Sequence, residues 1–204
     1  MLLLGITGGV GMGKSTVAGA MRRKAVAVID TDELARQLTQ PGAPALAEIS
    51  KAFGPSVFRA DGLLDRAALA RMVFNDASAR AQLEGILHPA IRAAWLAQAD
   101  QWRRDNVKLG AVIIPLLFET GAESNFDATV CVACSAATQH VRLMERGWKP
   151  GEIAARIAAQ WPVEKKIAHS DFVVWTDTPF DAAEAQLGRI IDSAGTLRKT
   201  PACA

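Results

Sequence analysis

The residues Gly8 to Ser15, with the sequence GGVGMGKS, are the first in the chain whose types and spacing could do chemistry. They match the pattern G-x-x-x-x-G-K-[ST] in full, and they lie between an apolar segment typical of a strand (2–6) and a segment with helical character (15–24). This context predicts a phosphate-binding loop, in which backbone N–H groups surround nucleotide phosphates at the amino end of a helix. The alternative, a glycine-rich turn without a ligand, is disfavoured because strand, motif and helix come in the required order.

The side chains of this loop have separate expected roles. Lys14 is expected to neutralise charge on the β- and γ-phosphates of the nucleotide, and the hydroxyl of Ser15 is expected to bind Mg²⁺. The expected nucleotide-binding residues are Gly9, Val10, Gly11, Met12, Gly13, Lys14, Ser15 and Thr16.

Two carboxylates follow the second predicted strand, AVAVI (25–29). Asp30 and Asp32 are expected at the carboxyl edge of the sheet, where open α/β folds bind their ligands. One could accept the proton of an attacking hydroxyl, while the other helps to hold a metal ion through its waters. The alternative for Asp32 is that it only caps the following helix.

The third predicted strand, AVIIP (111–115), takes the position after which many phosphate-binding-loop proteins carry a metal-binding aspartate. Here the nearest carboxylate is Glu119, which could also be a solvated loop residue. Metal binding is therefore expected to depend on Ser15 and on the pair Asp30 and Asp32. That arrangement suits small-molecule kinases better than motor ATPases.

Five short apolar segments separated by helical patterns predict the α/β class, with a five-stranded parallel sheet flanked by helices. A long helical stretch after the second strand is more than a crossover requires, so it predicts an inserted substrate-binding subdomain. A second helical insertion precedes the last strand. The predicted strands are 2–6, 25–29, 111–115, 128–133 and 172–175; the single domain 1–204 divides into a core (about 1–31, 108–145 and 170–195), a subdomain (about 32–107) and the second insertion (about 146–169).

Local signals refine the long insertion. Asp65 is expected to cap a helix, the segment 53–64 (FGPSVFRADGLL) is expected to form a loop or short hairpin, and Pro89 is expected to kink or restart a helix. The segment 193–204 is expected to be a loose tail.

Composition narrows the functional classes. The net charge of +2 is too small to indicate a nucleic-acid partner, and no apolar run is long enough to indicate a membrane partner or a signal peptide. Three cysteines are too few for a disulfide framework and favour a reducing compartment, so a cytoplasmic protein is expected; no protein partner is indicated. Cys131 and Cys134 form a CxxC, but in a buried strand they should face opposite sides, which disfavours a metal or redox site.

A linked set of motifs resembles the dephospho-CoA kinase family over nearly the whole chain, from LGITGGVGMGKSTVA to DAAEAQLGRII. Besides the phosphate-binding loop, the set comprises VIDTDELARQL…PGAPAL, LEGILHPAIR, PLLFETG and RLMERGW…RIAAQ. The resemblance implies a P-loop kinase fold and ATP-dependent phosphorylation of the ribose 3′-hydroxyl of dephospho-CoA. The products are CoA and ADP, and the reaction is the last step of coenzyme A biosynthesis.

The resemblance also implies roles for individual residues. Asp32 matches the catalytic base and acceptor ligand, while Arg146, Arg156 and Gln160 match a lid that closes over ATP. Arg146, with Lys14, is expected to act on the transferring phosphoryl group, although it could also be a surface salt-bridge partner. For His88 a core or helix-kink role stays open beside substrate contact. The residues expected to bind the acceptor are Thr7, Asp32, His88, Arg92, Leu117 and Glu119.

The chain departs from the family pattern at two places. Met12 stands where the family usually has a small residue, which is tolerable because that position contributes mainly its backbone. The turn after the last strand has Thr176 and Thr178 in place of Asn and Gly, so nucleotide selectivity could differ if that turn contacts adenine.

Two other functions compete with this interpretation. Another small-molecule or nucleoside monophosphate kinase is disfavoured by the long helical insertion and the His88–Pro89 segment. A GTP-dependent switch would need a guanine-reading N-K-x-D, which the sequence lacks. Its D-x-x-G occurs only at 192–195, too late to sense a γ-phosphate.

Overall fold

The computed structural model describes residues 1–177 and 179–194. Thr178 and most of the expected tail, 195–204, lie outside these described residues. The chain forms two compact units, one made of residues 1–30 and the chain from Trp102 onward, the other of Thr31–Gln101. The boundary of the second unit falls at 31 and 101, where the sequence indicated about 32 and 107.

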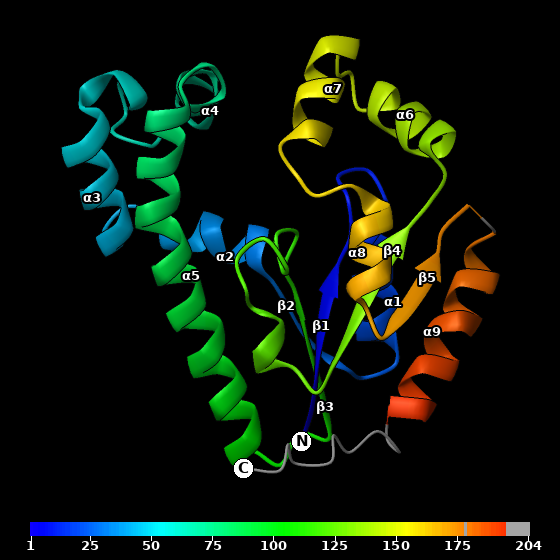
Figure 1. Cartoon of the computed structure of the whole chain (residues 1–204). Helices are drawn as coiled ribbons and strands as arrows, with labels where there is room; N and C mark the ends of the chain where they lie inside the picture. The colour runs from blue at the N-terminus through cyan, green and yellow to red at the C-terminus, as the bar shows by residue number, and fades with distance from the viewer. Residues whose placement is uncertain (178, 195–204) are drawn as a thin grey trace. The chain divides into compact units, whose positions relative to one another are not determined.

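The first unit is built on a five-stranded parallel sheet with the order β2-β3-β1-β4-β5 (Figure 1). In the register of the central strand, Ile6 lies opposite Ile113 on one side and Val130 on the other. The fold class is therefore confirmed. The strands are β1 (Leu2–Thr7), β2 (Ala27–Asp30), β3 (Leu109–Ile113), β4 (Ala128–Ala133) and β5 (Phe172–Trp175).

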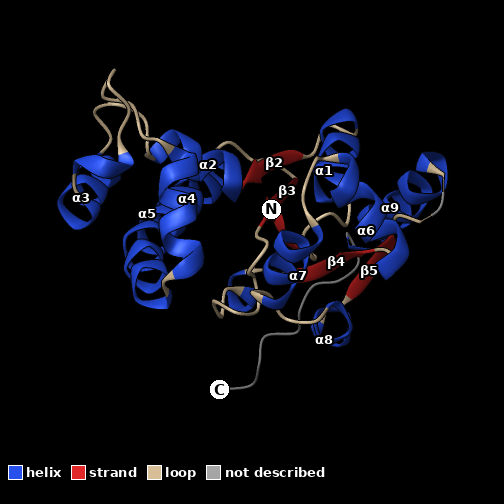
Figure 2. Cartoon of the chain, turned by 90° about the horizontal axis from the view of Figure 1, so that it is seen from above, coloured by secondary structure: helices blue, strands red, loops and turns tan. Residues whose placement is uncertain are grey.

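Helices cover both faces of this sheet, which explains why the strands read as continuous apolar runs. Alternate residues such as Leu4, Ile6 and Val130 form one core with α1 and α9. The opposite face carries α8, which contacts β4, and Figure 2 shows α8 across the sheet from α1 and α9. The helices of this unit are α1 (Lys14–Arg23), α6 (Ala136–Glu145), α7 (Pro150–Ala158), α8 (Val163–His169) and α9 (Phe180–Ala194), with a short 3₁₀ helix η2 (Glu123–Asn125).

The bounds of two strands, β2 and β3, differ from those that the sequence predicted. β2 begins at Ala27 because Ala25, with φ of 58°, belongs to the turn after α1. β3 ends at Ile113 because Pro115 has no N–H to donate to a ladder. It gains Leu109 and Gly110, which pair with Leu2 and Leu3.

The second unit is helical. Its small core contains the buried side chains of Ile49, Val57 and Leu69, with partly buried aromatic and aliphatic residues around them. Its elements are α2 (Thr31–Leu38), α3 (Pro44–Phe53), the 3₁₀ helix η1 (Pro55–Val57), α4 (Arg66–Asn75) and α5 (Ala77–Arg104).

The structure confirms two of the three local predictions made for the second unit. The carboxylate of Asp65 accepts hydrogen bonds from the N–H groups of Ala67 and Ala68, which confirms it as the cap of α4. An antiparallel bridge between Phe58 and Leu64 confirms the short hairpin. Of the kink or restart expected at Pro89, the restart does not occur, because α5 continues through this residue. A proline inside a helix removes only its own backbone donor.

Cys131 and Cys134 are buried thiols in different surroundings. Burial raises the pKa of Cys131 to about 11, with the cations of Lys166 and Lys14 opposing the shift, whereas Cys134 lies near Arg142 and Asp177. Within the described residues no three His, Cys, Asp or Glu side chains are grouped as metal ligands. In the same part of the chain, no helix has the length and apolar character needed to cross a membrane.

The raised pKa predicts that Cys131 resists alkylation in the native protein. Its pKa rises from 9.0 to about 11, so its thiolate fraction at pH 8 falls by about 100-fold, and iodoacetamide should react more slowly by at least about that factor than in guanidinium. The shift also makes the free energy of unfolding fall as the pH rises from about 9 to 11, because the unfolded thiol then ionises first. Peptide mapping by mass spectrometry gives the labelling rate, and equal native and denatured rates would contradict the burial.

Candidate functional site

The predicted phosphate-binding loop connects β1 to α1. Gly8 has a φ of 147°, and a Cβ atom there would lie 2.2 Å from the carbonyl oxygen of Val132 on β4. Gly13 has a φ of 91° and is the N-cap of α1, with its carbonyl oxygen accepting the N–H groups of Thr16 and Val17. Among the described residues no side chain caps this helix end, and its first turn has no acidic residue. The helix therefore presents N–H groups and a positive dipole end to an anion.

The geometry at Gly8 predicts a severe effect of Gly8→Ala. Strain at the positive φ and the overlap with Val132 should lower the free energy of unfolding by roughly 1–3 kcal/mol. The loop should also lose its nucleotide affinity, because the β1–α1 connection must shift away from β4. Gly85→Ala in α5 is the matched control, since nothing lies within 4 Å of its added Cβ. Urea unfolding and titration with a fluorescent ATP analogue measure both effects, and a normal midpoint with normal affinity would contradict the geometry.

Lys14 lies across the mouth of this loop. Its Nζ donates to the carbonyl oxygens of Gly8, at 2.8 Å, and Gly9, at 2.9 Å. Ser15 and Thr16, the next residues of α1, are exposed. The structure thus brings the predicted nucleotide-binding residues 9–16 together in one loop and the first turn of one helix.

The loop is held in place by side chains from later elements. The carbonyl oxygen of Val10 accepts from Nε2 of the buried Gln139 in α6, at 2.7 Å, and its N–H donates to Oε1 of Gln160, at 3.0 Å. Sequence reasoning missed Gln139. The available signal was its spacing of four residues from Leu143, which places a polar residue on the buried face of α6.

Thr176, one of the two departures from the family pattern, supports the same loop. Its buried hydroxyl donates to the carbonyl oxygen of Met12, at 3.0 Å, and accepts from Nη1 of Arg142, at 2.8 Å. Arg142 also donates to the carbonyl oxygen of Thr176. The threonine side chain also lies close to Gly13, where an added Cβ would be 3.2 Å from it, so Thr176 restrains the loop at two residues. Arg142 was not identified from the sequence.

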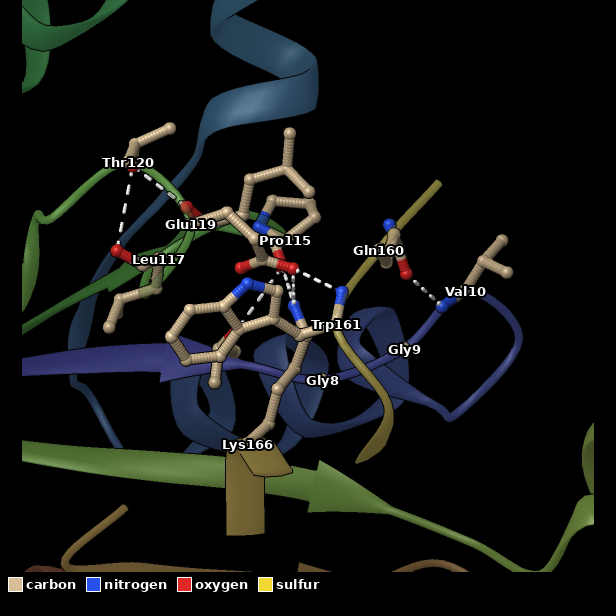
Figure 3. A network of polar contacts seen from close by, with 12 residues as sticks. Gly8, Gly9, Val10, Pro115, Leu117, Glu119, Thr120, Gln160, Trp161 and Lys166 are labelled. Carbon is tan, nitrogen blue, oxygen red and sulfur yellow. Dashed lines mark hydrogen bonds and ion pairs between the residues drawn. The ribbon is translucent and has the colours of Figure 1, made fainter. Parts of the chain in front are cut away.

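Pro115, Leu117 and Glu119 follow β3 and lie beside the loop (Figure 3). The hydroxyl of Thr7, the last residue of β1, donates to the carbonyl oxygen of Pro115 at 3.2 Å, and Leu117 is fully buried. Glu119 Oε1 lies 2.8 Å from Nζ of Lys166 and accepts the N–H of Trp161 at 2.8 Å. Glu119 Oε2 is buried and accepts no hydrogen bond from the described residues.

The three predicted lid residues have different surroundings. Arg146 is exposed at the end of α6. Arg156 in α7 pairs with Glu152 at 3.1 Å, and its guanidinium lies over the ring of Trp148 at 4.2 Å. Gln160, after α7, is the lid residue whose side chain reaches the phosphate-binding loop.

The expected acceptor and metal residues are divided between the two units. Asp30 is the last residue of β2, at the carboxyl edge of the sheet. Asp32 is exposed in the first turn of α2 and belongs to the second unit, as do His88, which is half-buried, and the exposed Arg92 of α5. Their action beside the phosphate-binding loop stays a prediction.

The residues present fit Mg²⁺ bound through a nucleotide. Mg²⁺ usually keeps several waters and takes one or two protein ligands together with substrate phosphates, so it needs no cage of protein carboxylates. The exposed hydroxyl of Ser15 at the amino end of α1 and the carboxylate of Asp30 are suitable donors.

A parallel sheet in the order β2-β3-β1-β4-β5, a phosphate-binding loop between β1 and α1, and a helical segment between β4 and β5 define a P-loop kinase. More narrowly, the chain belongs to the dephospho-CoA kinase family, whose sequence model matches residues 2–181.

Individual relatives agree with this assignment. A dephospho-CoA kinase of Anaeromyxobacter dehalogenans is 46% identical over 175 residues, which cover 85% of this chain and 83% of that protein. One of Geobacillus kaustophilus is 40% identical over 199 residues, or 97% and 99% of the two chains. The solved structure of a dephospho-CoA kinase from Campylobacter jejuni has a TM-score of 0.70 at 26% identity, covering 95% of this chain and 97% of that one.

Proposed function

We propose that this protein transfers the γ-phosphoryl group of ATP to the ribose 3′-hydroxyl of dephospho-CoA, giving CoA and ADP. The observation that carries the proposal is the family match over residues 2–181, with a phosphate-binding loop of the required geometry inside it. The reaction is then the last step of coenzyme A biosynthesis. A cytoplasmic location stays a prediction from the sequence.

Phosphoryl transfer depends mainly on positioning and on stabilising charge, so few groups are needed. The loop amides and Lys14 would hold the β- and γ-phosphates. Arg146 would reach the γ-phosphoryl group when the lid closes, since its planar guanidinium can bind two phosphate oxygens. When bound through Ser15 and Asp30, Mg²⁺ supplies further neutralisation of the phosphate charge.

The base of ATP has a candidate site beside the loop. A small pocket is lined by residues of the loop and α1, including Gly13 and Thr16, by Arg142 and Thr176, and by Glu184 of α9. Its position next to the first turn of α1 is appropriate for the nucleoside, because the phosphates would occupy that turn.

The acceptor side of the proposal assigns the general base to Asp32. A carboxylate in hydrogen-bond reach of the 3′-hydroxyl would take its proton as the new bond to phosphorus forms. Thr7, Leu117, His88 and Arg92 are proposed to line the acceptor site.

A turnover screen tests the proposal and separates it from another small-molecule kinase. The protein is incubated with ATP and Mg²⁺ and with dephospho-CoA, AMP, CMP, UMP or shikimate in turn, and the phosphorylated products are identified by mass spectrometry. We expect a kcat/KM for dephospho-CoA at least about 10²-fold above that for the other acceptors. Comparable or faster transfer to one of the others would overturn the substrate assignment.

A further inference from the structure

Gln160 and Trp161, which we call the lid base, are bound from two directions at the point where α7 ends and α8 begins (Figure 3). The side chain of Gln160 accepts the N–H of Val10 in the phosphate-binding loop at 3.0 Å. The N–H of the next residue, Trp161, donates to Glu119 at 2.8 Å. Two neighbouring residues of the lid base therefore connect the nucleotide loop to the segment that follows β3.

Glu119 is itself fixed by a buried cation. Nζ of Lys166 lies 2.8 Å from Glu119 Oε1 and donates to the carbonyl oxygen of Pro115 at 2.6 Å. The Lys166 side chain is 0% exposed and that of Glu119 is 15% exposed, so little water competes for these contacts. Lys166 shares one face of α8 with the partly buried Val163 and Ile167, a spacing that identifies an inward-facing lysine.

The ring of Trp161 packs on the segment that follows β3 and on α8. It stacks on Phe118 with ring centroids 6.2 Å apart and makes a T-shaped contact with His169, with centroids 5.4 Å apart. The ammonium group of Lys165 lies 3.3 Å from its centroid. The indole and the backbone of Trp161 are thus held by the 118–119 segment and by α8 together.

In the phosphate-binding loop, the connection to the lid base is made at Val10. Both backbone polar groups of Val10 are bonded to side chains: its carbonyl oxygen accepts from Gln139, and its N–H donates to Gln160. A displacement of the lid base removes one of these two restraints, so the loop and the lid base should respond to one another.

We propose that Glu119, fixed by Lys166, is a positioning residue that holds the lid base so that Gln160 stays bound to the phosphate-binding loop. This assignment replaces the expected direct contact of Glu119 with the acceptor. It rests on the proposed kinase function only for its turnover readout. The buried Glu119 Oε2, which accepts no bond from the described residues, is the feature that a ligand role would use instead.

Two double variants distinguish positioning of the lid base from direct contact with the acceptor. Glu119→Leu with Lys166→Met replaces the ion pair by apolar side chains without leaving a buried charge, which protects the fold. Glu119→Gln with Lys166→Met differs from it at one position, where it keeps an oxygen that can accept the Trp161 N–H. Glu164→Gln, on the exposed face of α8, controls for the loss of a nearby carboxylate.

The primary measurement is hydrogen exchange in the ligand-free protein, followed in peptides that cover 8–13 and 159–166. Coupled sites typically influence one another roughly 5–150-fold, so we expect about tenfold faster exchange of both peptides in the leucine variant. Glu164→Gln should stay near the wild-type rate. The glutamine variant should lie between the wild type and the leucine variant, because it keeps an acceptor for the Trp161 N–H but lacks the contacts of Lys166. The leucine variant combined with Gln160→Leu should show no additive increase, because both changes break one connection.

Turnover supplies the second readout. In the leucine variant kcat should fall about tenfold while KM for dephospho-CoA stays within about threefold, as expected when positioning rather than binding is lost. Unchanged exchange in the leucine variant would overturn the proposal, whatever happens to turnover. An acceptor KM raised in both double variants would assign Glu119 to the substrate instead. If the wild-type protein did not phosphorylate dephospho-CoA, the proposed function would fail, and the exchange result would still decide this inference.

Discussion

Lys14→Ala is expected to remove nearly all phosphoryl transfer while leaving the fold intact. The ammonium group lies in the mouth of the phosphate-binding loop, bonded to the carbonyl oxygens of Gly8 and Gly9, and no other loop side chain carries positive charge. Removing one preorganised donor from a charge-stabilising site typically lowers kcat by about 10²–10³-fold, and a full charge next to the transferring group should lie at the upper end.

Thermal melting is required beside turnover, because Lys14 also restrains the loop through those two carbonyl oxygens. We expect only a small decrease in the melting temperature, since Lys14 lies outside the core formed by β1, α1 and α9. Lys51→Ala, at an exposed position of α3, is the matched control for loss of a lysine. A well-folded Lys14→Ala protein with near-normal kcat would contradict the role of the loop.

The sheet and the loop could be predicted because both depend on local sequence. Apolar runs such as 128–133, flanked by helical patterns, leave few alternatives to buried parallel strands. The loop is a contiguous motif in which backbone geometry requires glycine: at Gly8 a Cβ atom would lie 2.2 Å from the carbonyl oxygen of Val132. Neither prediction needed knowledge of which distant residues meet.

The side chains that hold the loop in place could not be predicted, because they depend on contacts between residues far apart in the sequence. Gln139, Thr176 and Lys166 act through partners more than 40 residues away, and their types are common on solvated surfaces. A polar residue on the buried face of an amphipathic helix could have indicated Gln139 and Lys166, but Thr176 follows β5 and lies on no helix. Of the kink or restart expected at Pro89, the restart does not occur, because the loss of one backbone donor does not end a helix of 28 residues.

For Glu119, the sequence and the structure suggest different roles. The sequence predicts Glu119 as an acceptor-binding residue, with a solvated loop residue as the alternative. The structure pairs one of its oxygens with Lys166 and Trp161, which favours a role in holding the lid base. A carboxylate expected to contact the acceptor can therefore act by positioning other residues. The contacts in the structure distinguish these two roles, which the sequence does not.

Asp32→Asn is expected to lower kcat for transfer to dephospho-CoA by about 10²–10⁴-fold, the range typical of general-base catalysis. A ribose hydroxyl is a weak nucleophile at neutral pH, and asparagine keeps the shape of the side chain but cannot take its proton. ATP affinity, which depends mainly on the loop and α1, should stay within a few-fold. The structure places Asp32 in the first turn of α2, exposed to solvent and two residues after the end of β2.

The rival explanation is that Asp32 only stabilises the start of α2. Asp32 is the second residue of α2, so a purely structural role would act through the helix dipole, and it predicts little change in kcat. Glu33→Gln removes a second exposed carboxylate from the same helical turn and controls for the interaction of charge with the helix dipole. We therefore expect Glu33→Gln to retain kcat within about threefold, because such surface effects are worth only about 0.3–1 kcal/mol. Steady-state kinetics with a thermal melt of each variant decide the matter: equal kcat values for Asp32→Asn and Glu33→Gln would remove Asp32 from the chemistry, because loss of charge alone would then account for both.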